Sequence, residues 1–314
     1  MVGGYDLPSL EIASALFERI HPEVHPVSSL ECAEMTKLVE NTFRFVAIGF
    51  SNELSRIARA FGLNSWEVIG AARTKNFGFE LCFPGLIGGH CIPIDPHYLS
   101  WALRNKRQIA NFVDVAERAH QDMKRDALDL IQRSLNQYGR GFADSSVLFL
   151  GITYKKNVGD IRESAALELM KKLLSANATV SFWDPVRAKN TIRPRPRISF
   201  SDEERAFLSR KTSDKLELDD GGEYHFRPDE LTGQWEAIKD RVLSGEFHCI
   251  VLATAHPEFD TSYNDLVFGS ARVPLVDLAN GVPSWIERSF SAELADQMKE
   301  QLRNQPSYML VGYQ

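Results

Sequence analysis

The sequence predicts an α/β protein, with an all-helical domain followed by a domain built on a parallel β-sheet. In the first part of the chain, apolar residues recur every three or four positions, which is the period of an amphipathic helix. In the second part, short apolar runs alternate with helical patterns, which is typical of a parallel sheet covered by helices. The length of 314 residues is sufficient for two domains of ordinary size.

The first part of the chain predicts long amphipathic helices. One helix should begin at Ser28 or Ser29, whose hydroxyl can accept an unpaired amide hydrogen bond of a first turn. Its apolar stripe consists of Met35, Val39, Val46, Phe50, Leu54 and Ile57. A short helix at 65–72, a loop rich in glycine and proline at 78–96, and a second long helix at 109–135 follow. Two such helices usually pack on each other or on a second copy of the chain.

The second part predicts strands at 146–153, 179–183, 249–253 and 273–277, with helices at 165–174 and 234–243 between them. The pattern changes near 138–144, so we divide the chain into a helical domain at 29–138 and an α/β domain at 139–314. Residues 187–233 are polar and show no clear period, which indicates an insertion or a long surface loop. Ligands of parallel sheets usually lie at the carboxyl ends of the strands.

Composition restricts the classes of partner and location. The net charge of −6 argues against wholesale binding of polyanions, so no nucleic acid partner is expected. The four cysteines, Cys32, Cys82, Cys91 and Cys249, are scattered and predict free thiols in a reducing compartment. The sequence contains neither a signal peptide nor an apolar run of membrane-spanning length, so a cytoplasmic protein with no membrane partner is expected.

The strongest local signal is the segment GGHCIPIDP at 88–96. Two glycines directly before Cys91 permit close approach of a substrate carbon, and Asp95 could orient a water molecule beside it. Attack of the thiolate on an aldehyde, followed by loss of hydride, would give a thioester and then a carboxylic acid. Two alternatives stay open: Cys91 is a small buried residue, or His90, Cys91 and His97 bind a metal. The metal hypothesis is the weakest because four spaced ligands are absent, and we predict no metal.

Two further groups of residues suggest chemistry. Lys37 and Asn41 share one face of the first long helix with Glu34 and could stabilise a developing alkoxide, although a solvated helix face is the better explanation of this pattern taken alone. Lys155, Lys156 and Arg162 follow a predicted strand and precede a predicted helix, a position that suits a phosphate group; the alternative is a charged connection. Asp184 and His256 each follow a strand and could line the same crevice or serve as turn residues.

Taken in order, these segments resemble the UDP-glucose/GDP-mannose dehydrogenase family. The resemblance is carried by SSLECAEMTKLVENTFRFVAIGFSNEL, PGLIGGHCIPIDPHYLSW, LGITYKKNVGDIRESAALELMKKLL, TVSFWDP, IVLATAHPEF and VPLVDLANG. It implies a helical central domain that mediates homodimerisation, followed by a Rossmann-like domain that binds a UDP-sugar. It also implies oxidation of the C6 alcohol of a nucleotide sugar to the carboxylate, with NAD as cofactor.

By the same resemblance, Cys91 is the nucleophile, Lys37 and Asn41 stabilise the oxyanion, and Asp95 assists the proton and water steps. Substrate-binding roles fall to the residues that match the family's cysteine loop and sugar-nucleotide domain: Gly88, Gly89, His90, Lys155 and Arg162. The histidine before Cys91 and the isoleucine before Asp95 are more similar to the branch that oxidises UDP-N-acetylglucosamine or UDP-N-acetylmannosamine. A UDP-N-acetylhexosamine is therefore the expected substrate.

The sequence departs from the family pattern in two places. The glycine-rich G-x-G-x-x-G motif of an NAD-binding domain has no match here, so residues 1–28 are interpreted as the tail of a missing N-terminal domain and no NAD-binding residue is assigned. The glycine loop is also one residue shorter than the family pattern, with Leu86 beside Ile87. The alternative function is therefore an inactive homologue that retains only dimerisation and nucleotide-sugar binding.

Overall fold

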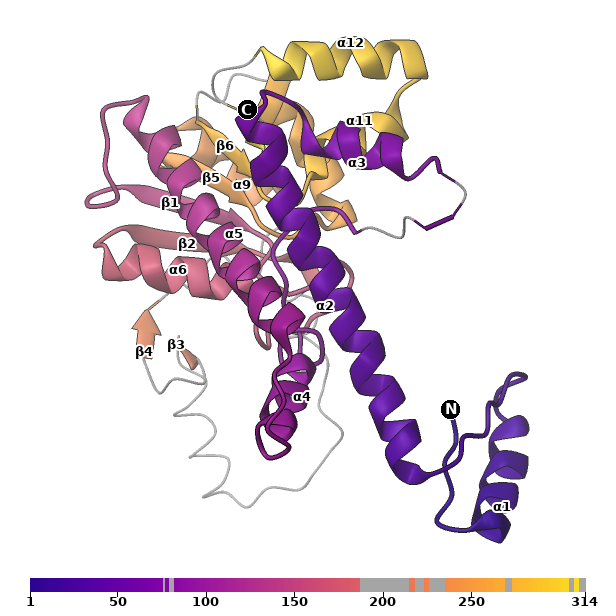
Figure 1. Cartoon of the computed structure of the whole chain (residues 1–314). Coiled ribbons are helices and arrows are strands. Elements are labelled where there is room, and N and C mark those ends of the chain that lie inside the picture. The colour runs from indigo at the N-terminus through magenta and orange to yellow at the C-terminus, as the bar shows by residue number, and fades with distance from the viewer. Residues whose placement is uncertain are drawn as a thin grey trace, which may run out of the picture.

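A computed structural model describes residues 1–75, 77–78, 82–186, 215–217, 223–225, 235–268, 273–304 and 308–310 (Figure 1). The helices that precede the sheet are α1 (Leu7–Glu18), α2 (Leu30–Ala60), α3 (Ser65–Ala72), α4 (Asp95–Arg104) and α5 (Asn111–Asn136). The sheet region contains β1 (Ser146–Leu150), α6 (Ala165–Ser175), β2 (Thr179–Trp183), α9 (Trp235–Leu243), β5 (Cys249–Leu252), η2 (Pro257–Phe259), α10 (Asp260–Tyr263), η3 (Asn264–Phe268), β6 (Leu275–Asp277), α11 (Gly281–Ser289), α12 (Ala292–Arg303) and β7 (Tyr308–Leu310). The predicted fold class is confirmed.

The predicted helices of the first part are present, and the first long helix has the predicted serine cap. The Ser29 hydroxyl accepts a hydrogen bond from the backbone N–H of Cys32 at 3.2 Å, and α2 begins at the next residue. Asn64 caps α3 in the same way through the N–H of Trp66 at 2.9 Å. In Figure 1 the first half of α2 extends away from the sheet, and its N-terminal end lies beside α1. No described helix is long and apolar enough to cross a membrane.

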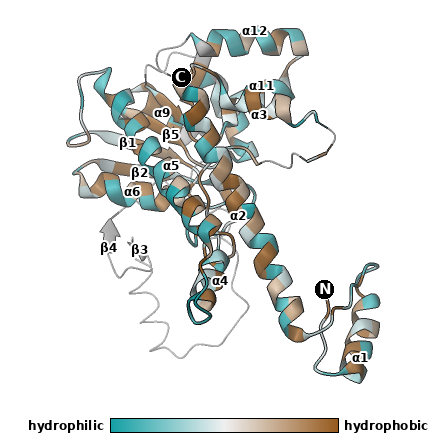
Figure 2. Cartoon of the chain, viewed as in Figure 1, coloured by the Kyte–Doolittle hydropathy of each residue, from teal (hydrophilic) through white to brown (hydrophobic). Residues whose placement is uncertain are grey.

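The apolar stripe predicted on α2 is largely exposed, although Val46 packs against Val113 and Ala116 of α5. Met35, Val39, Phe50 and Ile57 each keep more than two fifths of their surface accessible, and Figure 2 shows hydrophobic residues along the length of α2. The buried face instead contains Phe45 and small or polar residues. The two helices approach so closely that a Cβ on Gly49 would lie 2.9 Å from the Cβ of Ala116.

The sheet is wholly parallel, with the strand order β2-β1-β5-β6-β7. Its strands are buried apolar runs, as expected for a sheet with helices on both faces. The predicted strands are present, but β1, β5 and β6 are shorter than predicted. Helices α1, α4, α11 and α12 and strand β7 were not predicted from the sequence.

The hydrophobic core on one face of the sheet includes the second half of α5. Met123, Ala127 and Ile131 pack in the same cluster as Phe149 and Met170. The predicted division at about residue 138 lies just after the end of α5. The core on this face of the sheet already includes residues of α5 from Met123 onward. The domain limits stay a prediction.

Two regions had been assigned little structure from the sequence. Within the polar segment 187–233, β3 (Lys215–Glu217) and β4 (Glu223–His225) pair in antiparallel fashion, which differs from the predicted loop; the rest of that segment lies outside the described residues. In the N-terminal segment 1–28, the chain turns back after α1, so that Pro26 forms an isolated β-bridge with Val2.

Candidate functional site

The carboxyl ends of β1 and β5 form the topological switch point of the sheet. Strand β1 lies between β2 and β5, so the connections after β1 and β5 leave toward opposite sides. These two connections touch: Gly151 has a φ of +79°, and a Cβ there would lie 2.4 Å from the carbonyl oxygen of Thr254. A ligand site is therefore expected beside these two loops.

A cavity of about 590 Å³ opens at this point, between the sheet and the helical region. Its walls come from the loop after β1, the loop after β5, the start of α11, the end of α3 and the middle of α2. The segment 82–86, which leads toward the cysteine motif, completes the wall. We call this cavity the cationic cleft.

The lining of the cationic cleft carries a single sign of charge. Its basic side chains are Arg44, Arg73, Lys155, Lys156 and Arg288, and no aspartate or glutamate belongs to the described lining. The Arg73 guanidinium lies 5.0 Å from the centre of the Phe83 ring, and Arg288 forms an ion pair with Asp260 at 3.0 Å. Converging guanidinium and ammonium groups of this kind suit a phosphate or diphosphate ligand.

The predicted glycine loop packs against the segment that carries these lysines. Gly89 has a φ of +88°, and its N–H donates to the carbonyl oxygen of Arg162 at 3.2 Å. A Cβ on Gly88 would lie 2.7 Å from the Glu163 carbonyl oxygen, and one on Gly89 would lie 2.8 Å from the Tyr154 ring. Glycine is therefore required at both positions, and Tyr154, which lines the cationic cleft, also contacts the loop that precedes Cys91.

Cys91 is exposed at the end of this loop, four positions before Asp95, the first residue of α4. Its carbonyl oxygen accepts a hydrogen bond from the N–H of Asp95 at 2.9 Å, which starts the helix. The Asp95 carboxylate accepts a hydrogen bond from the buried Asn41 side-chain amide on α2. Lys37 lies one helical turn before Asn41 and is exposed, with its ammonium 3.7 Å from Glu40. The structure thus joins Asn41 and Asp95 and leaves Lys37 at the surface nearby.

Arg162 lies beside the cysteine loop, where its backbone carbonyl accepts the hydrogen bond from Gly89. Arg162 binds Asp160 through its guanidinium at 2.6 Å. The hydrogen bond with Asp160 raises the pKa of Arg162, and the Cys91 side chain adds a smaller contribution. The same hydrogen bond lowers the pKa of Asp160, with His90 among the smaller causes. His90, Cys91 and Arg162 are therefore electrostatic neighbours.

The structure does not place Lys155 and Arg162 in one cavity. Lys155 lines the cationic cleft, whereas Arg162 lines a separate cavity of about 360 Å³ against α5 and α6. His97, the third residue of the metal hypothesis, pairs with Glu117 at 3.4 Å. Across the described part of the chain, no group of three or more His, Cys, Asp or Glu side chains is arranged to bind a metal ion.

Sequence reasoning missed a clamp that fixes the start of the cysteine segment. Asn52 on α2 is 1% exposed, accepts a hydrogen bond from the Gly85 N–H at 2.8 Å and donates to the Gly85 carbonyl at 3.1 Å. His120 on α5 lies 3.2 Å from the same amide, and burial lowers the pKa of this histidine. The helix period places Asn52 on the same face as Phe45, seven positions earlier, but its bonds to Gly85 leave no local signal in the sequence.

Replacing Asn52 with alanine is expected to destabilise the protein by about 1–2 kcal/mol, because the half-buried peptide groups of Gly85 lose both bonds to this side chain. Urea unfolding measures this change. The matched control is Ser55→Ala, which truncates a buried polar residue whose hydroxyl bonds only the Asn52 carbonyl within its own helix. An equal loss of stability in both variants would show that the clamp on Gly85 contributes nothing specific.

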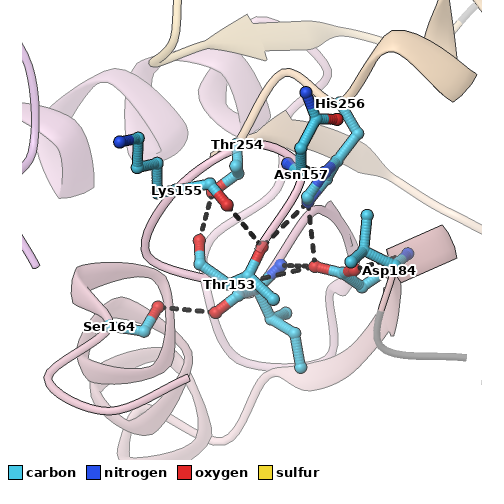
Figure 3. A network of polar contacts seen from close by, with 9 residues as sticks. Thr153, Lys155, Asn157, Ser164, Asp184, Thr254 and His256 are labelled. Atoms are coloured by element: carbon cyan, nitrogen blue, oxygen red, sulfur yellow. Dashed lines mark hydrogen bonds and ion pairs between the residues drawn. The ribbon is translucent and has the colours of Figure 1, made fainter. Parts of the chain in front are cut away.

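Asp184 and His256 are buried beneath the loop after β1 and do not line the cationic cleft. Both side chains are fully inaccessible to solvent. Figure 3 shows them in one network with Thr153, on the side of the loop that faces the sheet. Asp184 does hold its own turn, because its carboxylate accepts a hydrogen bond from the N–H of Val186 at 3.1 Å, and both residues also bond the loop after β1.

Comparison with known proteins agrees with this arrangement. Residues 31–121 match the model of the UDP-glucose/GDP-mannose dehydrogenase family, central domain, and residues 148–212 match that family's UDP binding domain. The chain is 33% identical over 186 residues to the UDP-N-acetyl-D-mannosamine dehydrogenase of Methanococcus maripaludis, a match that covers 59% of this chain and 42% of that protein. It is 30% identical over 176 residues to the UDP-N-acetyl-D-glucosamine 6-dehydrogenase of Pseudomonas aeruginosa, which covers 56% of this chain and 42% of that protein.

The structure is also similar to that of the UDP-N-acetyl-D-mannosamine dehydrogenase of Pyrococcus horikoshii. The TM-score is 0.69 at 22% sequence identity, and the match covers 99% of this chain and 59% of that one. The chain thus spans less than half the length of the curated relatives it matches. The chain belongs to the UDP-glucose/GDP-mannose dehydrogenase family, of which it contains the central and the UDP-binding domains.

Proposed function

We propose that the chain binds the UDP part of a nucleotide sugar in the cationic cleft. The observation that carries this proposal is the convergence of five basic side chains, with no described acidic side chain, at the switch point of the sheet. A diphosphate presents its negative charge to such a surface, and Lys155 and Lys156 lie at the carboxyl end of β1, where phosphate groups are commonly bound. The matched UDP binding domain supports the same assignment.

For the reaction, we propose oxidation of the C6 alcohol of the sugar to a carboxylate, with Cys91 as nucleophile. The Cys91 thiolate adds to the C6 aldehyde, loss of hydride gives a thioester, and water releases the carboxylate and the thiol. Asn41 and Lys37 stabilise the oxyanion, and Asp95, positioned by Asn41, orients the proton and the water. Support comes from the exposed position of Cys91 and from the hydrogen bond between Asn41 and Asp95.

When bound, NAD would supply the hydride acceptor, which takes up two electrons at each oxidation. The sequence contains no G-x-G-x-x-G motif, so its residues do not match the usual pyrophosphate site, and we assign none of them to NAD. The preferred substrate is a UDP-N-acetylhexosamine, in agreement with the names of the two relatives from Methanococcus maripaludis and Pseudomonas aeruginosa.

A second candidate is a homologue that binds a nucleotide sugar without turnover. The short glycine loop favours it, because Leu86 lines the cationic cleft at a position where the family pattern has glycine. Calorimetry with UDP and an assay of NADH formed from a UDP-N-acetylhexosamine and NAD separate the two. Binding with turnover supports the dehydrogenase, and binding without turnover supports the second candidate. Absence of binding would contradict both.

We also propose that a second copy of the chain covers the exposed apolar side chains of α2 and α5. These side chains line a groove of about 410 Å³ that contains Phe43, Val46, Phe50, Phe112 and Val115, and Phe112 is 78% exposed. Contiguous exposed apolar surface of this kind is typical of an interface. In a symmetric dimer, α2 and α5 of one copy would cover the same apolar surface of the other copy.

Light scattering is expected to give the mass of a dimer for the native chain and of a monomer for Phe50→Glu, because a buried unpaired carboxylate opposes association. Leu294→Glu, which places the same charge on an exposed apolar position of α12, is the matched control and should leave the dimer intact. A dimer that persists in Phe50→Glu would place the interface elsewhere.

A further inference from the structure

We propose that His256 is a positioning residue, which holds the loop after β1 in the conformation that presents Lys155 and Lys156 to the cationic cleft. This inference deepens the UDP-binding proposal and rests on it for its consequence for affinity. The part that concerns the loop itself rests on geometry alone. Figure 3 shows the residues involved.

The contacts of the His256 ring fix its protonation pattern. The backbone N–H of Asn157 donates to Nδ1 at 3.3 Å, so Nδ1 must be unprotonated. The proton of the neutral ring therefore lies on Nε2, which is 2.8 Å from the Thr153 hydroxyl oxygen and donates to it. The buried ring thus bonds two points of the same loop from below.

These two points, Thr153 and Asn157, flank Lys155 and Lys156 in the sequence. The Thr153 hydroxyl, which accepts from His256, is free to donate its own proton to the Lys155 carbonyl at 3.4 Å. At the other end, Asn157 has a φ of +64°, a left-handed conformation that asparagine adopts more readily than other non-glycine residues. The bond from its N–H to His256 fixes this end of the turn. The turn that carries Lys155 and Lys156 is therefore held at both ends by one imidazole.

Asp184 at the end of β2 anchors this arrangement to the neighbouring strand. One carboxylate oxygen accepts hydrogen bonds from the N–H groups of Ile152 at 2.8 Å and Thr153 at 3.1 Å. The same oxygen lies 3.3 Å from Nε2 of His256. The loop is thus connected to the ends of β2 and β5 at once, and its lysines can bind an anion without first being ordered, which lowers the entropic cost of binding.

Two substitutions distinguish the contribution of Nδ1 from that of Nε2. His256→Asn retains an acceptor at the position of Nδ1 for the Asn157 N–H, whereas His256→Gln retains a donor near the position of Nε2 and loses that acceptor. His248→Gln is the matched control, because the Nδ1 of His248 accepts a backbone N–H from Ser146 at 3.0 Å at the opposite end of the sheet. A thermal melt of each variant reports its folding.

Affinity for UDP is measured by calorimetry on the full chain. We expect UDP binding to weaken about tenfold in His256→Gln, with most of the affinity recovered in His256→Asn and unchanged affinity in His248→Gln. A residue that serves only to fill the core would change the melting temperature without this split in affinity. Equal UDP affinity in all three variants would overturn the proposal, as would equal losses in the two His256 variants.

A measurement without ligand tests the positioning role of His256 independently of UDP binding. Imidazole ¹⁵N chemical shifts should show His256 with a bare Nδ1 and a protonated Nε2 at neutral pH, and the Asn157 amide resonance should shift in His256→Gln more than in His256→Asn. If these signals appear and the native chain binds no UDP, the proposed function fails while the positioning stands. If His256 instead carries its proton on Nδ1, the positioning fails even though UDP binds.

Discussion

Replacing Cys91 with alanine is expected to reduce turnover of a UDP-N-acetylhexosamine by at least about 1,000-fold, because the proposed thioester forms on the sulfur of this residue. The side chain is exposed at the end of the glycine loop and precedes α4, where a substrate carbon can reach it. NADH formation from the full chain, substrate and NAD measures the loss. UDP affinity should stay close to that of the native chain, since the cationic cleft does not include Cys91.

The matched control for this substitution is Cys32→Ala. Cys32 is also an exposed free cysteine, but it lies in the first turn of α2 and lines none of the cavities described above. Its replacement should leave turnover unchanged. Turnover that survives in the Cys91 variant would exclude the thioester route and leave the dehydrogenase without its proposed nucleophile.

Replacing Arg44 and Lys155 together with alanine is expected to weaken UDP binding about 100-fold, since each charge-assisted contact with a phosphate accounts for about a factor of ten. The two side chains come from α2 and from the loop after β1, so they approach the cationic cleft from both parts of the structure. Calorimetric titration with UDP measures the effect. The loss should shrink as the salt concentration rises, because screening already weakens the native contacts.

A matched double variant, Arg104→Ala with Lys106→Ala, removes the same charge from exposed positions at the end of α4. Neither residue lines the cationic cleft. If long-range attraction alone brought UDP to the protein, the two double variants would lose equal affinity. An equal loss would therefore contradict a specific site at the switch point.

Much of the fold was predictable because its signals are local. The period of three or four identifies α2 and α5, and the Ser29 cap sets the start of α2 at the predicted place. The buried strands β1, β2 and β5 are continuous apolar runs, which are readable without knowledge of their neighbours. Helix α1 lacks a clear amphipathic pattern and β7 is only three residues long, whereas α12 is about as amphipathic as α5 and could have been predicted.

The candidate site was predictable only in part. The segment GGHCIPIDP identifies Cys91 and Asp95, and the helix periodicity places Asn41 on one face with Lys37. The roles of Asn52 and His256 were not visible, because each acts by bonding the backbone of a segment far away in the sequence. Such pairings carry no local pattern, since a side chain that bonds a peptide group requires only proximity and not a particular residue type.

The sequence by itself determined the α/β class, the order of the helical and sheet regions, and the cysteine loop with its flanking glycines. Only the tertiary structure decided that the apolar stripe of α2 is exposed, that Arg44, Arg73 and Arg288 join Lys155 in one cleft, and that His256 supports the loop beneath. The physical reason is the range of the interactions. Backbone periodicity and turn preferences act over a few residues, whereas burial and the convergence of charges depend on segments brought together by folding of the whole chain.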